Sequence, residues 1–315
     1  MDELKFKRLE VLTEIRKTFP KSKILKYSKF KSGLVGKAYK INISSPKKIL
    51  VLKIYKLKRK EIIIKGNKIA QFLLTNNIPT AKVYSNSIVS DKGLLLMDYV
   101  GRKNLLEIYN PSSKEVRKKV LYGAGKLLRQ VHSLKAPFYW RHYKHNVEDG
   151  VQWISWTKIR VRKYLLFTRK KLGKKRYFYL KNEFERLLRL LESERYMKVV
   201  PLHWDYHLEN VVCSDKSNRI SIIDFDNVMK GHNLADIGQF YEVLIQDAKG
   251  EHDFTSFLNG YDLKITSKHK EMVFDYFLLH LIAVLRSIWL KKRLRWLIKD
   301  KLRTLDACID GNYKI

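Results

Sequence analysis

The residues with the greatest capacity for chemistry lie in the stretch 201–213, which reads PLHWDYHLENVVC. Asn210 follows Asp205 by five positions, and two β-type runs over 211–223 then lead to Asp224. Phosphoryl transfer needs a carboxylate that accepts the proton of the attacking hydroxyl, and a second carboxylate and an amide oxygen that hold Mg²⁺. A loop with Asp205 and Asn210, followed by a hairpin that ends at Asp224, predicts these groups at one site.

A metal site of another kind is the alternative at the same loop. His203 and His207 are four positions apart on either side of Asp205, a spacing that zinc ligands also use. The sequence offers no third ligand at a convincing spacing. We therefore interpret His207 as an ordinary loop residue.

The helices and strands that must position these residues divide the chain into two parts with different sequence patterns. The first hundred residues predict a β-rich unit with an N-terminal helix over 1–20 and one inserted helix. Turn signals separate its runs, which we place at 24–30, 38–43, 49–55, 82–89 and 93–99 for strands and at 59–76 for the inserted helix.

The rest of the chain, 101–315, is mostly helical in pattern. An amphipathic helix is predicted over 113–134, two more over 151–198 around Gly173, and further helices over 235–305. The fold class we predict is α+β, with a small antiparallel β lobe, 1–100, and a larger helical lobe, 101–315.

The amino-acid composition indicates which broad classes of protein are excluded. The chain has 315 residues, 45% of them hydrophobic, and a formal net charge of +34, which argues against disorder. Two cysteines and a charged N-terminus without an apolar core favour a cytoplasmic protein over a secreted one. The most apolar run, 276–290, is interrupted by His280 and Arg286, so we predict no transmembrane segment.

The charge is unevenly distributed. Residues 203–253 contain ten acids and four bases, so this segment has a net charge of −6 and the remainder carries +40. A basic excess can attract nucleic acid or an anionic surface, but lysines outnumber arginines, which is also typical of solvated faces. We interpret nucleic acid as not required and a peripheral contact with an anionic surface as open, because the Trp-bearing basic stretch 289–302 is amphipathic.

The motif resembles the aminoglycoside phosphotransferase and choline-kinase-like family, which has a protein-kinase-like fold. That family has His-Gly-Asp, four residues and Asn, then a hairpin and Ile-Asp-Phe-Asp; this chain has His203-Trp-Asp205, four residues, Asn210 and then IDFD at 223–226. The resemblance implies Asp205 as the catalytic base, with His203 bracing the loop. It also implies Asn210 and Asp224 as Mg²⁺ ligands, and a structural role for the aspartate that follows at 236, Asp236.

The resemblance extends to a nucleotide site for ATP or GTP in the first hundred residues. Gly33 and Gly36 would lie in the turn over the phosphates, and Lys53 would bind the α- and β-phosphates. The run LLLMDYVG resembles the family's hinge, whose backbone meets adenine at Asp98, Tyr99 and Val100. The matching features follow in the family's order over about two thirds of the chain.

Two residues depart from the family pattern. Trp204 stands where the family usually has Gly. The glutamate that usually pairs with the strand lysine falls near Gly66, and Glu61 is the only acid on the predicted helix. Either this helix is shifted, or another carboxylate serves, or the pair is absent.

Three functions remain open at this stage. The first is an ATP-dependent phosphotransferase acting on a hydroxyl of a small molecule, which the short interval between Asp224 and Asp236 favours over a protein kinase. The second is a catalytically inert relative that binds nucleotide, and the third is a binder of nucleic acid or a membrane surface. The acceptor is also open: the acidic segment would suit a cationic compound, whereas the basic remainder favours an anionic sugar, a lipid headgroup or an envelope glycan.

Overall fold

The computed structural model describes residues 8–30, 37–56, 60–89, 92–141, 146–214, 220–248 and 250–313. The chain forms two compact units. Unit 1 contains residues 1–103 and 212–226, and unit 2 contains residues 104–211 and 227–315.

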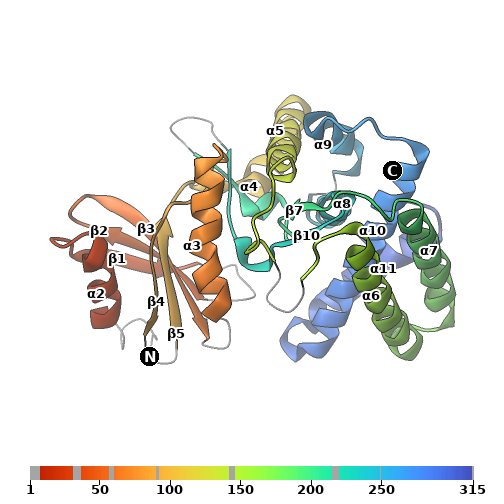
Figure 1. Cartoon of the computed structure of the whole chain (residues 1–315), viewed down its shortest axis with the longest axis horizontal. Helices are drawn as coiled ribbons and strands as arrows, with labels where there is room; N and C mark the ends of the chain where they lie inside the picture. Colours follow the sequence, from red (N-terminus) through yellow and green to blue (C-terminus); the bar gives the residue numbers. More distant parts are fainter. Residues whose placement is uncertain are drawn as a thin grey trace. The chain divides into compact units, whose positions relative to one another are not determined.

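Unit 1 is built on an antiparallel sheet of five strands in the order β1-β2-β3-β5-β4 (Figure 1). The strands are β1 (Ile24–Lys29), β2 (Lys37–Ile43), β3 (Lys48–Lys56), β4 (Val83–Val89) and β5 (Lys92–Asp98). Two helices belong to this unit, α2 (Arg8–Thr18) and α3 (Lys60–Thr75).

The alternation of side chains in β3 determines which residues reach which face of the sheet. Leu50, Leu52 and Ile54 belong to a core that also contains Val11 and Ile15 of α2. Side chains of neighbouring residues in a strand point to opposite faces. Lys53 and Tyr55 therefore lie on the other face, where Tyr55 packs with Ile62 of α3 and Leu95 of β5.

A hairpin from the second half of the sequence belongs to unit 1. The strands β6 (Lys103–Asn104), β8 (Val211–Cys213) and β9 (Ile220–Ile222) form a sheet in the order β6-β8-β9. Thr80 pairs with Ile222 in a parallel bridge, and the Thr80 hydroxyl donates to the Ile222 carbonyl at 2.7 Å. The hairpin therefore groups with residues 1–103.

Unit 2 is mostly helical (Figure 1). Its helices are α4 (Leu105–Tyr109), α5 (Lys114–His132), α6 (Gly150–Lys171), α7 (Lys174–Glu192), α8 (Leu234–Ala248), α9 (Phe254–Tyr261), α10 (Ser267–Leu290) and α11 (Ile298–Ile309). The short 3₁₀ turns are η2 (Leu208–Asn210), η3 (Phe225–Asn227), η4 (Glu251–Asp253) and η5 (Lys292–Leu297), and β7 (Val200–Leu202) pairs with β10 (Met229–Gly231).

Two glycines allow α5 and α9 to cross closely. A Cβ at Gly125 would lie 2.0 Å from the Phe257 carbonyl oxygen, and one at Gly260 would lie 2.0 Å from the Tyr122 carbonyl oxygen. No side chain fits at such distances, so both positions require glycine.

Helix α10 is longer than the apolar run seen in the sequence. It has 24 residues and is long and apolar enough to cross a membrane by length and composition alone. In unit 2 it packs against α8, α7 and α6, and Asp275 in its first half is fully buried. Arg186 of α7 pairs with that carboxylate at 2.6 Å, as expected for a core helix of a folded unit.

The predicted fold class is confirmed: a smaller antiparallel β unit with one inserted helix accompanies a larger helical unit. The helix break at Gly173 is also present, with Gly173 at φ +91° between α6 and α7. The sequence analysis missed β10 and did not divide the last helical region, where the structure has α8, α9, α10 and α11.

A buried ion pair predicts how the stability of unit 2 depends on pH. Glu242 of α8 is 1% exposed and lies 2.7 Å from Lys301 Nζ and 3.2 Å from His280 Nδ1. Burial alone would raise the pKa of Glu242, but Lys301 and His280 outweigh it and lower the pKa to about 2. Because the folded pKa lies below the unfolded one, Glu242 contributes stability above about pH 4.5 that is lost as the pH falls toward 2.

We expect Glu242→Gln to lower the free energy of unfolding by about 3 kcal/mol near pH 7 and by much less near pH 3. Urea unfolding followed by circular dichroism at both pH values measures this difference. The matched control is Glu185→Gln, which changes an exposed carboxylate on α7. An equal loss of stability at both pH values would contradict the assignment to Glu242.

Candidate functional site

In unit 2, the loop between β7 and η2 is anchored by one buried carboxylate. Asp236 is fully buried, and its two oxygens accept from the backbone N–H groups of His203 at 2.8 Å and Trp204 at 2.9 Å. His132 Nε2 lies 3.1 Å from the same carboxylate, and His132 Nδ1 lies 2.7 Å from the Tyr261 hydroxyl. Asp236 thus fixes the backbone immediately before Asp205.

Trp204 adopts the backbone conformation that explains the family's glycine. Its φ is +60°, in the left-handed region that a bulky side chain rarely occupies. Its N–H is held by Asp236, and its indole packs edge-on against Trp156 at 5.3 Å and Trp153 at 5.8 Å. These contacts offset the strain, so the loop keeps its turn without glycine.

Asp205 presents a carboxylate that solvent can reach. Its side chain is 36% exposed, and Asn227 Nδ2 donates to Asp205 Oδ2 at 3.3 Å. His207 Nε2 lies 3.8 Å from Asp205 Oδ1. The carboxylate is therefore oriented by neighbours and still accessible, which a proton acceptor requires.

The side chain of Asn210 is turned in a fixed direction by the same loop. Its Nδ2 donates to the Asp205 carbonyl oxygen at 2.8 Å and lies 3.0 Å from His207 Nε2. The amide nitrogen thus faces the loop, and Oδ1 is the atom that a cation would meet. His207 helps to set this direction, a role that the sequence analysis did not assign.

In unit 1, Lys53 of β3 meets the two aspartates at the end of the β8–β9 hairpin. Lys53 Nζ lies 2.7 Å from Asp224 Oδ1 and 3.8 Å from Asp226 Oδ1. The Tyr55 hydroxyl donates to Asp226 Oδ1 at 2.9 Å. Lys53 and Tyr55 share one face of β3, so the strand's alternation brings both to the hairpin.

Burial and charge act against each other in this cluster. Burial lowers the pKa of Lys53, but Asp224 and Asp226 outweigh it and the pKa is well above its usual value. Burial also raises the pKa of Asp226, to about 6, although the nearby Lys53 opposes this. Lys53 therefore carries its charge near neutral pH.

The hinge residues lie at the end of β5. The side chain of Asp98 pairs with Lys48 at 2.7 Å and accepts from the Tyr84 hydroxyl at 2.9 Å. Asp98 follows Leu96 by two positions on the α2 face of the sheet, opposite to Lys53. The Asp98 backbone N–H donates to the Lys82 carbonyl oxygen at 2.9 Å.

Three of the predicted site residues cannot be placed with their side chains. Gly33 and Gly36 lie outside the described residues, and Glu61 lies in α3 with a side chain outside them. Gly66 lies in the middle of α3, and a Cβ there would meet Leu95 Cδ2 at an ordinary 3.6 Å. Within the described residues, the carboxylates that pair with Lys53 are Asp224 and Asp226.

His203 is fully buried, and its ring packs edge-on against Tyr206 at 5.8 Å. It contacts Asp236 through its backbone, so its place is that of a brace within the loop. In the part of the chain that the structure describes, no three His, Cys, Asp or Glu side chains form a cluster that could hold a metal.

The sequence analysis missed two contributors to these clusters. Asn227 directly follows the IDFD motif, and its amide reaches Asp205. Arg160 of α6 lies with its Cζ 5.0 Å from the Trp204 ring centroid and 4.4 Å from that of Trp156. The signal for Arg160 was its i, i+4 spacing from Trp156, which was hidden in a strongly basic segment.

The sequence matches a known protein family over most of its length. The model of the phosphotransferase enzyme family matches residues 26–271, most of the chain. The chain belongs to this family. No curated protein matches the sequence.

Solved structures share the fold at low sequence identity. A thermostable mutant of the aminoglycoside phosphotransferase APH(4)-Ia, in its apo form, has a TM-score of 0.69 and 12% identity, with 95% of this chain and 98% of that chain covered. An ethanolamine kinase of Plasmodium vivax has a TM-score of 0.64 and 13% identity, covering 91% and 84%. The ADP-bound aminoglycoside phosphotransferase APH(2'')-Ib has a TM-score of 0.61 and 17% identity, covering 97% of each chain. The fold is therefore protein-kinase-like, as the sequence motifs indicated.

The role of Asp236 can be tested by one isosteric change. Asp236→Asn replaces an acceptor oxygen with an NH₂ group that faces a backbone N–H or His132, so a buried donor loses its partner. We expect the free energy of unfolding to fall by about 2–3 kcal/mol. Thermal and urea unfolding measure this, and Asp262→Asn, an exposed partner of Arg129, is the matched control. Equal effects of the two substitutions would contradict the anchoring role.

Proposed function

We propose that this protein is an ATP-dependent phosphotransferase that moves the γ-phosphate to a hydroxyl of a small molecule. The observation that supports this most directly is the pair between Lys53 and Asp224, 2.7 Å apart, which β3 and the hairpin bring together. Membership of the phosphotransferase enzyme family supports the same reaction class. Relatives of the same fold were solved with ADP, among them a spectinomycin phosphotransferase and APH(2'')-Ib.

The nucleotide would be bound by unit 1. Lys53 would pair with Asp224 before the nucleotide binds and with the α- and β-phosphates afterwards. Gly33 and Gly36 would cover the phosphates, and the backbone from Asp98 through Val100 would face adenine or guanine. Asp226 would keep Lys53 aligned, and the Tyr55 hydroxyl and a buried position would hold Asp226 in turn.

The donor atoms present suit magnesium. Asp224 offers a carboxylate that is 33% exposed, and Asn210 offers an amide oxygen because its nitrogen is bound within its own loop. Hard oxygen donors are what Mg²⁺ takes in proteins. We propose Asn210 and Asp224 as its protein ligands; when bound, the ion would neutralise charge on the phosphates.

The proton of the acceptor hydroxyl would pass to Asp205. Its carboxylate is oriented by the Asn227 amide, which keeps one oxygen engaged. Asp236 and the backbone of His203 hold the loop in position, so they act as positioning residues rather than on the substrate. The acceptor would thus meet a base whose direction is fixed before binding.

These assignments give the two parts of the chain different roles. Residues 1–100 would bind the nucleotide, and 101–315 would supply the catalytic loop and the acceptor site. We propose a cytoplasmic location, where ATP is available.

Replacement of the proposed base gives the first activity test. Asp205→Asn keeps the size of the side chain and removes its ability to take a proton, so we expect kcat to fall by about 10²–10⁴-fold. ADP release is measured with and without hydroxyl acceptors, and nucleotide affinity should stay within about twofold. Glu209→Gln changes another exposed carboxylate in the same loop and is the control. Unchanged turnover in Asp205→Asn would contradict the mechanism, and ATP binding without turnover in the unaltered protein would favour an inert nucleotide binder.

Replacement of the proposed metal ligand should act on nucleotide binding instead. We expect Asp224→Asn to remove the strengthening of ATP binding by Mg²⁺, while binding without Mg²⁺ changes little. Isothermal titration at several Mg²⁺ concentrations measures this, with Asp300→Asn on α11 as an exposed control. An undiminished Mg²⁺ effect would remove Asp224 from the ligand set.

A further inference from the structure

Among the described residues, Arg160 is a cation without a counter-ion: no carboxylate there lies within 4.0 Å of its guanidinium, and its Nε is buried without a hydrogen-bond partner. The guanidinium contacts the Trp156 and Trp204 rings and the Tyr164 hydroxyl, which accepts from Nη2 at 2.6 Å. Burial lowers the pKa of Arg160, which reflects the cost of holding this charge without an anion.

The aromatic rings fix the plane of the guanidinium. Trp153 and Trp156 stack at 4.8 Å, and Trp204 meets both edge-on. A guanidinium held among aromatic rings keeps its place, and it binds carboxylate or phosphate through charge-assisted hydrogen bonds. Since Trp204 directly precedes Asp205, this guanidinium lies beside the loop that carries the proposed base.

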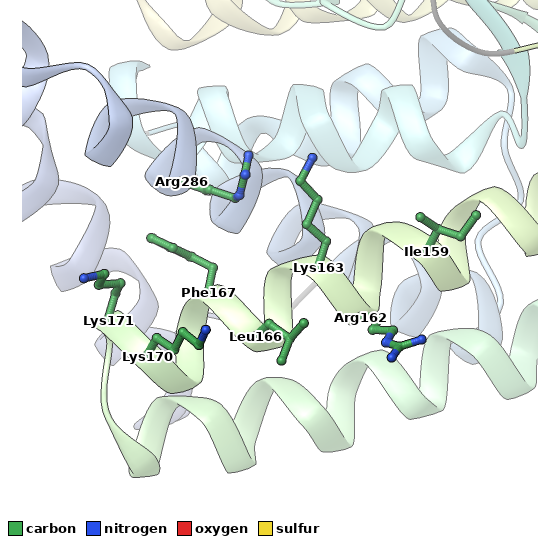
Figure 2. A pocket seen from close by; sticks show the side chains of 8 residues that line it. All are labelled: Ile159, Arg162, Lys163, Leu166, Phe167, Lys170, Lys171 and Arg286. Atoms are coloured by element: carbon green, nitrogen blue, oxygen red, sulfur yellow. The ribbon is translucent and has the colours of Figure 1, made fainter.

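The same helix borders a basic groove further along. Figure 2 shows the cavity of about 470 Å³, with side chains of α6 on one side and Arg286 of α10 on the other. Its lining consists of Ile159, Arg162, Lys163, Leu166, Phe167, Lys170, Lys171 and Arg286. Five of these eight side chains are cationic, and none is acidic.

Arg160 lies on the same face of α6 as two of the residues that line the groove. Lys163 and Phe167 follow Arg160 by three and seven positions, so the three share one face of α6. In Figure 2, Lys163 and Arg286 extend into the same space above Phe167. The lining also has apolar character: Ile159 is 69% exposed and Leu166 is 50% exposed, and Phe167 packs against Trp289 at 6.0 Å.

We propose that this face of α6 binds an anionic amphiphile, with its headgroup anion at Arg160 and its hydrocarbon part along the groove. The inference rests on the proposed function, and it names the acceptor class: a lipid-like molecule whose headgroup carries a phosphate or carboxylate and a free hydroxyl. Five groove cations and Arg160 would repel a polycationic aminosugar, while the apolar groove residues would be poorly matched to a free phosphate alone.

The first test measures binding without catalysis. The full chain is sedimented with vesicles of phosphatidylcholine that contain about 30% phosphatidylglycerol, and with vesicles of phosphatidylcholine alone. We expect binding to the anionic vesicles only, and binding should weaken as salt rises. Lys163→Glu combined with Arg286→Glu should weaken it about thirtyfold or more.

The matched control is Lys119→Glu with Lys126→Glu. It makes the same change in net charge at two exposed positions on α5. We expect a loss of less than about threefold. Equal losses in the two double variants, unchanged binding in the groove variant, or equal binding to both kinds of vesicle would overturn the proposal.

The second test concerns the headgroup and the hydrocarbon. Dihexanoyl phosphatidylglycerol, used as a soluble competitor, should displace the protein from vesicles at least tenfold more effectively than glycerol 3-phosphate, which has the anion without the hydrocarbon. Equal competition would reduce the site to a phosphate site and overturn the amphiphile. Arg160→Lys, which keeps the charge and loses the guanidinium, should weaken both competitors, whereas an unchanged response would remove Arg160 from the site.

Failure of the proposed function is a separate result. The Asp205→Asn variant should bind the vesicles as the unaltered protein does, because the groove is independent of the base. If Asp205→Asn also left turnover unchanged, the assigned mechanism would fail while the vesicle result stood. If vesicle binding failed and Asp205→Asn abolished turnover, the phosphotransferase would remain and the acceptor class would be wrong.

Discussion

The loop that carries Asp205 depends on one constraint: a fully buried carboxylate must be given donors. Asp236 satisfies it with the N–H groups of two consecutive residues, His203 and Trp204, and with the ring of His132. A charge left unpaired in the interior is expensive, so the donors cannot move away independently. The backbone before Asp205 is therefore fixed by the start of α8, more than thirty residues later in the chain.

This constraint also accounts for the unusual residue at 204. The left-handed backbone that Asp236 requires is easiest for glycine, yet the chain has tryptophan there. The indole contacts Trp153 and Trp156, which glycine could not do. Its ring also lies 5.0 Å from the Arg160 Cζ. The strain and the aromatic cluster are thus two consequences of a single substitution.

The sequence predicted the strands of unit 1 because short β-type runs alternate with clear turn signals, even though β5 is buried on both faces. The order and spacing of Lys53, Asp205 and Asp224 also marked them as candidate site residues, and their roles stay predictions. The sequence could not predict which carboxylate pairs with Lys53, because Asp224 and Asp226 reach it through a hairpin whose attachment depends on Thr80 and Ile222. Local patterns contain no information about a bridge between residues so distant in the chain.

Arg160 was hidden for a different reason. The segment around it is so rich in lysine and arginine that no single cation stands out, and only packing shows which guanidinium has a buried Nε between aromatic rings. The short strand β10 was missed because three residues do not establish a periodicity, and its pairing with β7 is again a long-range event.

The acidic segment has a different meaning once burial is known. Asp236 and Glu242 are fully engaged inside unit 2, and Asp253 is buried against the Tyr109 hydroxyl and the Arg117 guanidinium. These acids hold helices together, so they contribute little field to an approaching ligand. Asp205, Glu209 and Asp224 of the same segment are each about a third or more exposed, so the field of this segment comes from the loop and the hairpin, whereas the groove along α6 is lined by cations.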